Sequence, residues 1–136
     1  MPLVLIDSSV WIDYYQPGTS ENLESAVKKL IEADEVAING IIAVEVLQGT
    51  ANDNGYQKVL ADMAAFRELV LNWNAFRRAA QLGFDLRREG ITIPTIDILI
   101  AATALENNCH LWHQDNHYEL IAEKTNLKTK NWLNQL

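Results

Sequence analysis

The chain has 136 residues, of which 49% are hydrophobic, and its formal net charge is −7. That length suits one domain with a buried core and is short for two, and the hydrophobic content excludes a disordered chain. No apolar run approaches the roughly 20 residues that span a bilayer. The single cysteine, Cys109, excludes an internal disulfide. Together with an N-terminus typical of a strand rather than a signal peptide, it predicts a cytoplasmic protein with no membrane partner.

The negative net charge is only a weak argument against a nucleic-acid partner. Proteins that bind polyanions usually carry a basic surface. Carboxylates gathered around a divalent cation would account for part of the negative balance, however, and the ion would reverse the local sign. Five arginines within 67–88 and three lysines within 124–130 could still contact phosphates. A solvated helix face is the simpler interpretation of the arginine pairs at 77–78 and 87–88.

The hydrophobic pattern predicts short strands that alternate with helices. The expected strands cover residues 3–6, 36–38, 69–71, 109–112 and 127–129. The expected helices cover residues 10–15, 20–31, 41–48, 56–66, 73–89, 94–107 and 116–124. Ser20 is a typical N-cap, Gly90 a typical C-cap, and Pro94 suits a first helical turn. The alternation predicts an α/β fold with a mainly parallel sheet, in a single domain covering residues 1–136.

Two acidic residues directly follow predicted strands. Asp7 comes after the strand at 3–6, and Asp115 comes after the strand at 109–112. In an open parallel sheet, ligands bind outside the carboxyl ends of the strands. Each residue could instead only cap the helix that follows, because aspartate is a favoured N-cap. The sequence leaves both interpretations of this pair open.

Two further acidic residues lie in apolar segments that are expected to be helical. Glu45 interrupts the apolar run at 41–47, where an unpaired charge would be expensive to bury, although it could share an exposed edge with Gln48. Asp97 lies one turn inside an almost wholly apolar helix. The helix dipole alone favours an acid there, but the burial expected of that helix favours a functional role.

A metal site would explain all four acids together. Two carboxylates about 4 Å apart repel by about 4 kcal/mol at an effective dielectric constant near 20, and the pKa values of some members should rise. A hard divalent cation removes this repulsion and carries water that can become a nucleophile. We therefore predict that Asp7, Glu45, Asp97 and Asp115 are both the catalytic residues and the ligands of Mg²⁺ or Mn²⁺.

Three segments of the chain resemble motifs of the PIN-domain nuclease family, and within it of the VapC-type toxins of toxin–antitoxin pairs. Residues 4–13, Val-Leu-Ile-Asp-Ser-Ser-Val-Trp-Ile-Asp, resemble the first motif, residues 44–49 the second, and residues 94–104 the third. The combination extends over nearly the whole chain and is far more specific than any one segment.

The resemblance implies a fold, an activity and partners. The fold would be a PIN-like, doubly wound, mainly parallel sheet flanked by helices on both faces. The activity would be that of a Mg²⁺- or Mn²⁺-dependent endoribonuclease that cleaves RNA phosphodiester bonds with metal-activated water. The protein would be a homodimeric toxin whose cognate antitoxin covers the active-site groove with its C-terminal segment. By position, the four acids named above would form the site, and Ser9 would support it.

The fourth motif departs from the family pattern. His113 stands where the family usually has Thr or Ser, and His117 and Tyr118 stand where it often has Asp followed by Phe. Whether the two histidines take part in the site, and whether the site holds one metal or two, is therefore open. The identity of the target RNA and of the antitoxin is open as well.

Several alternative functions have some support in the sequence. Cys109, His110, His113 and His117 have spacings found in zinc sites, although a strand and a helix start should separate them. The protein could also be a DNA-directed or structure-specific PIN nuclease outside a toxin–antitoxin pair, because a metal-held phosphodiester site does not itself recognise the 2′-hydroxyl. A non-catalytic nucleic-acid-binding PIN module would be expected to lack one or more of the acids, and all four are present.

One aromatic cluster has two interpretations. Trp11, Tyr14 and Tyr15 could stack on nucleic-acid bases. At helical spacing directly after the first strand, however, such residues more often belong to a core or a dimer contact, and that interpretation is favoured.

Overall fold

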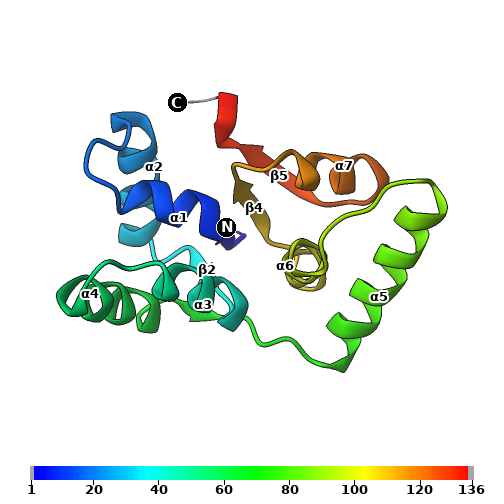
Figure 1. Ribbon diagram of the computed structural model, residues 1–136, viewed down its shortest axis with the longest axis horizontal. Coiled ribbons are helices and arrows are strands. Elements are labelled where there is room, and N and C mark those ends of the chain that lie inside the picture. Colours follow the sequence, from blue (N-terminus) through cyan, green and yellow to red (C-terminus); the bar gives the residue numbers. More distant parts are fainter. Residues whose placement is uncertain (1, 135–136) are drawn as a thin grey trace.

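Five short strands form the centre of the computed structural model, which describes residues 2–134 (Figure 1). They are β1 (Val4–Ile6), β2 (Val36–Ile38), β3 (Arg67–Glu68), β4 (His110–His113) and β5 (Lys128–Asn131). Their order across the sheet is β3-β2-β1-β4-β5, and every neighbouring pair is parallel. The middle strand, β1, is buried at all three residues, as expected for an apolar run covered on both faces. The extreme ends of the predicted domain, residues 1 and 135–136, lie outside the described residues.

Helices connect the strands throughout this described part. They are α1 (Ser8–Tyr14), α2 (Glu21–Glu32), α3 (Gly40–Gln48), α4 (Asp53–Ala64), α5 (Trp73–Arg88), α6 (Thr95–Glu106) and α7 (Asn116–Lys124), followed by a short 3₁₀ turn, η1 (Trp132–Asn134). Among residues 2–134, no helix combines the length and the apolar character needed to cross a membrane.

The chain winds in one direction and then in the other. It passes from β1 to β3 through α1–α4, and then returns to the opposite side of β1 through α5–α7. Because crossovers between parallel strands are right-handed, the two groups of helices cover opposite faces of the sheet. In Figure 1, α1, α2 and α4 lie on the left of the view, and α5, α6 and α7 lie on the right. The predicted doubly wound α/β fold is confirmed.

The winding reverses between β1 and β4, which are direct neighbours. Leu5 pairs with Leu111, and the Asp7 amide donates a 2.9 Å hydrogen bond to the Trp112 carbonyl. A crevice opens outside the carboxyl ends of the strands at such a reversal point, and it is the usual ligand site of this class of fold. Asp7 and Asp115 follow the two strands that border it.

Helix α6 occupies the middle of its layer. It packs along α5 and also contacts α3, α7 and β4, and its residues Ile100–Leu105 are all buried. Gly83 allows the close approach of α5, because a Cβ atom there would lie 3.1 Å from Ile98 Cδ1. The expectation that the helix around Asp97 is covered on most sides is confirmed.

Most predicted elements are present, but some boundaries were wrong. Helices α1 and α4 begin two or three residues earlier than expected, because the side chains of Asp7 and Asn52 accept hydrogen bonds from their first turns. Pro94 precedes α6 in extended backbone, with ψ of 141°, instead of forming its first turn. The third strand lies at Arg67–Glu68 and not at 69–71, because the chain pairs with β2 as soon as α4 has ended.

Helix α5 buries only one of its faces. Ala75, Ala79, Leu82 and Leu86 are buried, whereas Phe76 and Ala80 are exposed. The buried set lies on the side of α5 that faces α6.

The aromatic cluster belongs to the core. Trp11 is fully buried and stacks on Phe66 and Tyr15 at centroid distances of 5.3 and 5.8 Å. Trp11 is therefore inaccessible to nucleic-acid bases, and the core interpretation of this residue is confirmed.

Candidate active site

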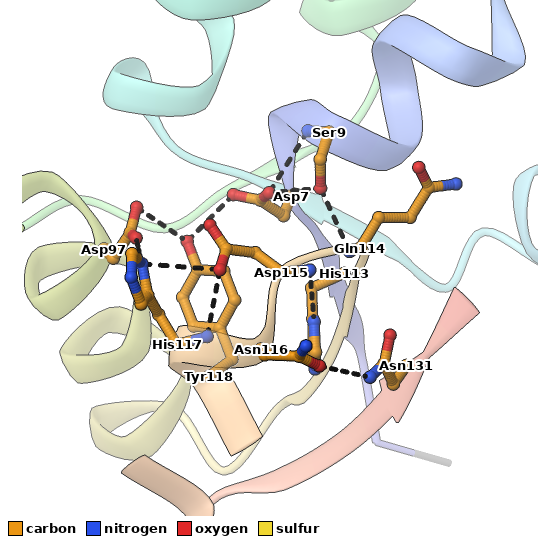
Figure 2. A network of polar contacts seen from close by, with 10 residues as sticks. All are labelled: Asp7, Ser9, Asp97, His113, Gln114, Asp115, Asn116, His117, Tyr118 and Asn131. Carbon is orange, nitrogen blue, oxygen red and sulfur yellow. Dashed lines mark hydrogen bonds and ion pairs between the residues drawn. The ribbon is translucent and has the colours of Figure 1, made fainter. Parts of the chain in front are cut away.

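Asp7 lies at the carboxyl end of β1 and is held from three directions. One of its oxygens, Oδ2, accepts hydrogen bonds from the Ser9 amide at 3.1 Å and the Ser9 hydroxyl at 2.6 Å. The other, Oδ1, accepts one from the Tyr118 hydroxyl at 3.0 Å. The residue is 5% exposed. It caps α1, which is one of the two roles expected from the sequence, and Figure 2 shows its carboxylate between Ser9 and the Tyr118 hydroxyl.

Ser9 joins the two strand ends that border the crevice. Its hydroxyl donates to Asp7 and accepts a hydrogen bond from the Gln114 amide at 3.1 Å. The Gln114 side chain donates in turn to Asp13 on α1 at 2.8 Å. Ser9 thus connects Asp7 to the backbone at the end of β4, and its supporting role in a metal site stays a prediction.

Glu45 reaches the same region from the middle of α3. Its Oε1 accepts a 3.0 Å hydrogen bond from the Ser8 hydroxyl. Burial raises the pKa of Glu45 above its ordinary value, and this rise exceeds the lowering by the Ser8 hydrogen bond. The charges of Asp7 and Asp97 raise the pKa further, so the three carboxylates are close enough to repel one another.

Asn39 fixes the position of α3 against α6, and the sequence reasoning did not identify it. It is 1% exposed and caps α3 by accepting a 2.9 Å hydrogen bond from the Ile42 amide. Its amide nitrogen donates to the Thr103 hydroxyl on α6 at 3.2 Å. The signal was present, because Asn39 directly follows a buried strand just as Asp7 does.

Asp97 enters from the first turn of α6. Its Oδ2 is 2.9 Å from His117 Nδ1, and its Oδ1 is 3.5 Å from the Tyr118 hydroxyl. Burial is the largest cause of its raised pKa, the hydrogen bond from His117 opposes that rise, and the charges of Asp115 and Asp7 add to it.

Asp115 caps α7 at the end of β4. Its Oδ1 accepts a 2.9 Å hydrogen bond from the His117 amide and lies 3.3 Å from Nδ1 of the same residue. Its side chain is 40% exposed, much more than that of Asp7. Asp115 therefore caps α7 and also lies at the carboxyl end of β4, next to the reversal point of the sheet.

His113 is completely buried and contacts the backbone of Asp115. Its Nδ1 accepts a 3.0 Å hydrogen bond from the Asp115 amide, so the ring hydrogen must be on Nε2. Nε2 lies 2.7 Å from Glu119 Oε2, to which the Thr129 hydroxyl also donates. The Thr129 hydrogen bond is the main reason that the pKa of Glu119 is lowered, and the contact with His113 lowers it further. His113 is thus occupied in orienting Asp115.

Tyr118 stands between two of the carboxylates. Figure 2 shows its hydroxyl between Asp7 and Asp97. Burial, followed by the charges of these two carboxylates, raises its pKa, so the hydroxyl keeps its hydrogen and remains a donor. The sequence reasoning noted Tyr118 only as a departure from the family pattern, and that departure was the signal for this contact.

The arrangement offers a divalent cation a suitable set of donors. Asp97, Asp115 and His117 each offer one ligand atom, and these three atoms lie within 4.8 Å of one another. Carboxylate oxygens and an imidazole nitrogen are ligands of divalent cations, and an ion would relieve the repulsion that raises the pKa values of Glu45 and Asp97. Of the four residues considered for a zinc site, only His117 belongs to this group, so that zinc set does not assemble among the residues that the structure describes.

The sequence and the fold were compared with those of known proteins. The sequence profile of the PIN domain matches residues 4–124. VapC ribonuclease Mb1587 of Mycobacterium bovis is 33% identical over 130 residues, which are 93% of this chain and 96% of that protein. The crystal structure of FitAcB from Neisseria gonorrhoeae has the same fold, with a TM-score of 0.80 at 20% identity over 97% of this chain and 99% of its own.

A third similar protein belongs to the VapBC family of toxin–antitoxin systems. The structure of VapBC-5 from Mycobacterium tuberculosis matches with a TM-score of 0.65 at 21% identity, over 96% of this chain and 98% of its own. At this identity the match bears on the fold alone.

Proposed function

The chain belongs to the PIN-domain family, among its VapC ribonucleases, and from this we propose that it is a metal-dependent endoribonuclease and the toxin of a toxin–antitoxin pair. One observation carries the proposal: where the winding of the sheet reverses, Tyr118 contacts both Asp7 and Asp97, His117 contacts both Asp97 and Asp115, and the charges of Asp7 and Asp97 raise the pKa of Glu45. Such a gathering of negative charge is costly unless a cation occupies it.

In this proposal the four carboxylates hold Mg²⁺ or Mn²⁺. The bound ion supplies Lewis-acid stabilisation of the phosphate and a more acidic water for attack at phosphorus. Ser9 and Tyr118 keep Asp7 in one orientation, while His113 keeps the backbone of Asp115 in place. Glu45 lines a groove of about 720 Å³ whose other lining residues are mostly apolar, so this carboxylate is accessible from that side.

The partners follow from the family. The substrate would be RNA, because the 33% identical relative from Mycobacterium bovis is a VapC ribonuclease. The antitoxin would be a separate protein, because VapC proteins belong to toxin–antitoxin pairs. A homodimer acting in the cytoplasm completes the proposal.

The test is cleavage of a structured RNA pool by purified, antitoxin-free protein with Mg²⁺ or Mn²⁺. We expect cleavage that stops when EDTA is added and that is absent in Asp97→Asn. The matched control is Asp85→Asn, which alters an exposed carboxylate on α5 and should cleave as the wild type does. Cleavage that persists in EDTA and in Asp97→Asn would contradict the proposed site.

The same assay separates the alternatives. A pool of the same sequences as DNA is included, and preferential cleavage of the DNA would replace RNA as the substrate. RNA retained on the protein without cleavage under any metal condition would favour a binding module instead.

A further inference from the structure

The imidazole of His117 lies among the carboxylates of the candidate site (Figure 2). Its Nδ1 is 2.9 Å from Asp97 Oδ2 and 3.3 Å from Asp115 Oδ1. Three donors gathered this closely can bind one ion, whose ligands stand about 2 Å from it on different sides. The group therefore contains a nitrogen donor as well as oxygen donors.

The backbone holds this imidazole in place. The His117 amide donates to Asp115 Oδ1 at 2.9 Å, so the N-cap of α7 sets the start of the helix from which the ring projects. In the metal-free protein, the hydrogen on Nδ1 faces two acceptors. With an ion bound at Nδ1, the neutral ring would carry its one N–H on Nε2, which is a usual state of a histidine ligand.

Asp7 lies outside this group of three donors. Its oxygens accept hydrogen bonds from Ser9 and from Tyr118, and the Tyr118 hydroxyl stands between Asp7 and Asp97. Asp97, Asp115 and His117 are the residues whose ligand atoms lie within 4.8 Å of one another.

We propose that His117 is a nitrogen ligand of the metal ion, together with Asp97 and Asp115, and that it makes the site prefer Mn²⁺ to Mg²⁺. Mg²⁺ is a hard cation that favours oxygen ligands and retains its water. Mn²⁺ also suits carboxylate ligands, but as a first-row transition metal it accepts an imidazole nitrogen more readily than Mg²⁺ does, so a nitrogen donor adds more to the affinity for Mn²⁺ than to that for Mg²⁺. The inference rests on the proposed function only for the use that is made of the ion in RNA cleavage.

The test measures metal binding directly, with no RNA present. Protein freed of metal by EDTA and dialysis is titrated with MnCl₂, free Mn²⁺ is followed by electron paramagnetic resonance, and MgCl₂ is added as the competitor. Electron spin-echo modulation of the bound Mn²⁺ then reports whether a ¹⁴N nucleus is coordinated. The variant is His117→Asp, which makes the donor set all-oxygen, and the control is His110→Gln, which alters a histidine of β4 outside the group.

We expect ¹⁴N modulation in the wild type and in His110→Gln, and its loss in His117→Asp. The ratio of Mn²⁺ to Mg²⁺ affinity should fall by about 10- to 100-fold in His117→Asp. Substitutions in and around a metal site usually change metal affinity by about this factor. Bound Mn²⁺ without ¹⁴N modulation in the wild type would overturn the proposal, and this result does not depend on how any variant folds. So would an unchanged affinity ratio in a folded His117→Asp protein.

Failure of this inference differs from failure of the proposed function. RNA cleavage with equal use of both metals and no ¹⁴N signal would remove the role of His117 and leave the ribonuclease intact. A ¹⁴N signal and a strong preference for Mn²⁺ without RNA cleavage would support His117 as a ligand and contradict the proposed function.

Discussion

The β1–α1 and β4–α7 junctions use the same backbone arrangement but hold their carboxylates differently. In each, an aspartate follows a buried strand and caps the next helix. Asp7 is 5% exposed and accepts three hydrogen bonds, whereas the Asp115 side chain is 40% exposed and accepts one from its own helix. The position at a strand end brings a carboxylate to the crevice, and the neighbouring side chains decide how firmly it is held.

The difference follows from the place of each strand in the sheet. β1 is central, and Tyr118 of α7 covers its carboxyl end. β4 lies next to the edge strand β5. The backbone amide of Asp115, at the end of β4, donates to the buried His113, whereas the Asp115 side chain is partly exposed. We therefore expect Asp7 to be a fixed part of the site and Asp115 an adjustable part.

The largest test of this comparison is to neutralise each aspartate in turn. Asparagine retains the ability to cap a helix, so both variants should fold. We expect Asp7→Asn to lower RNA cleavage by about 10³-fold or more, because a metal site contributes several kcal/mol and each 1.36 kcal/mol is tenfold in rate. Asp115→Asn should lower it by only about 10- to 100-fold, because Asp97 and His117 would still hold the ion and the partly exposed asparagine can turn its amide oxygen towards it. The rate of single-turnover cleavage measures both losses, and circular dichroism checks that both variants are folded. If the two folded variants lose the same activity, the distinction between a fixed Asp7 and an adjustable Asp115 is wrong.

A second test removes the side chain that holds each aspartate in place, which is His113 for Asp115 and Ser9 for Asp7. His113→Ala should lower the free energy of unfolding by about 2–4 kcal/mol, because it leaves a cavity and an Asp115 amide without its acceptor. Ser9→Ala should cost about 1–2 kcal/mol, since Asp7 keeps its hydrogen bonds from the Ser9 amide and from Tyr118. Urea unfolding in EDTA measures both. A larger loss in Ser9→Ala than in His113→Ala would reverse the assignment of the main support.

A third test removes the hydroxyl that covers Asp7. Tyr118→Phe should lower the free energy of unfolding by about 1–2 kcal/mol, because a buried carboxylate oxygen loses its donor. The control, Tyr56→Phe, alters a tyrosine that is 39% exposed on α4 and should stay within about 0.5 kcal/mol of the wild type. If the two variants unfold at the same urea concentration, Tyr118 does not hold Asp7 in solution.

The smallest expected effect is on the pH dependence of stability. The pKa of Glu45 is raised above its ordinary value of 4.5, so between these two values the folded protein binds more protons than the unfolded chain does. The corresponding stability is fully present below pH 4.5 and is lost as the pH rises through the folded pKa. In EDTA, Glu45→Gln should therefore lose less thermal stability than the wild type between pH 4 and pH 7.

The lowered pKa of Glu119 acts in the opposite direction, and the comparison between two proteins that both contain Glu119 removes its contribution. Parallel curves of Tm against pH for the wild type and Glu45→Gln would show that Glu45 does not titrate abnormally.

Local signals in the sequence predicted much of the fold and part of the site. The apolar runs at β1 and β2, the N-cap Ser20 and the span of α7 depend on neighbours within a few residues, so they were identified correctly. The four acids were singled out in the same way, as charges next to or inside apolar segments. Their roles as metal ligands and catalytic groups stay predictions until the variants are measured.

The sequence by itself determined the alternation of strands and helices, because hydrophobic periodicity and helix capping act over a few residues. Only the tertiary structure decided which side chains meet, because the contacts join distant parts of the chain. The hydrogen bonds from Tyr118 to Asp7 and from Gln114 to Ser9 span 111 and 105 positions. They form because the winding of the sheet reverses between β1 and β4, which brings two distant strand ends to one crevice, and no local pattern specifies that strand order.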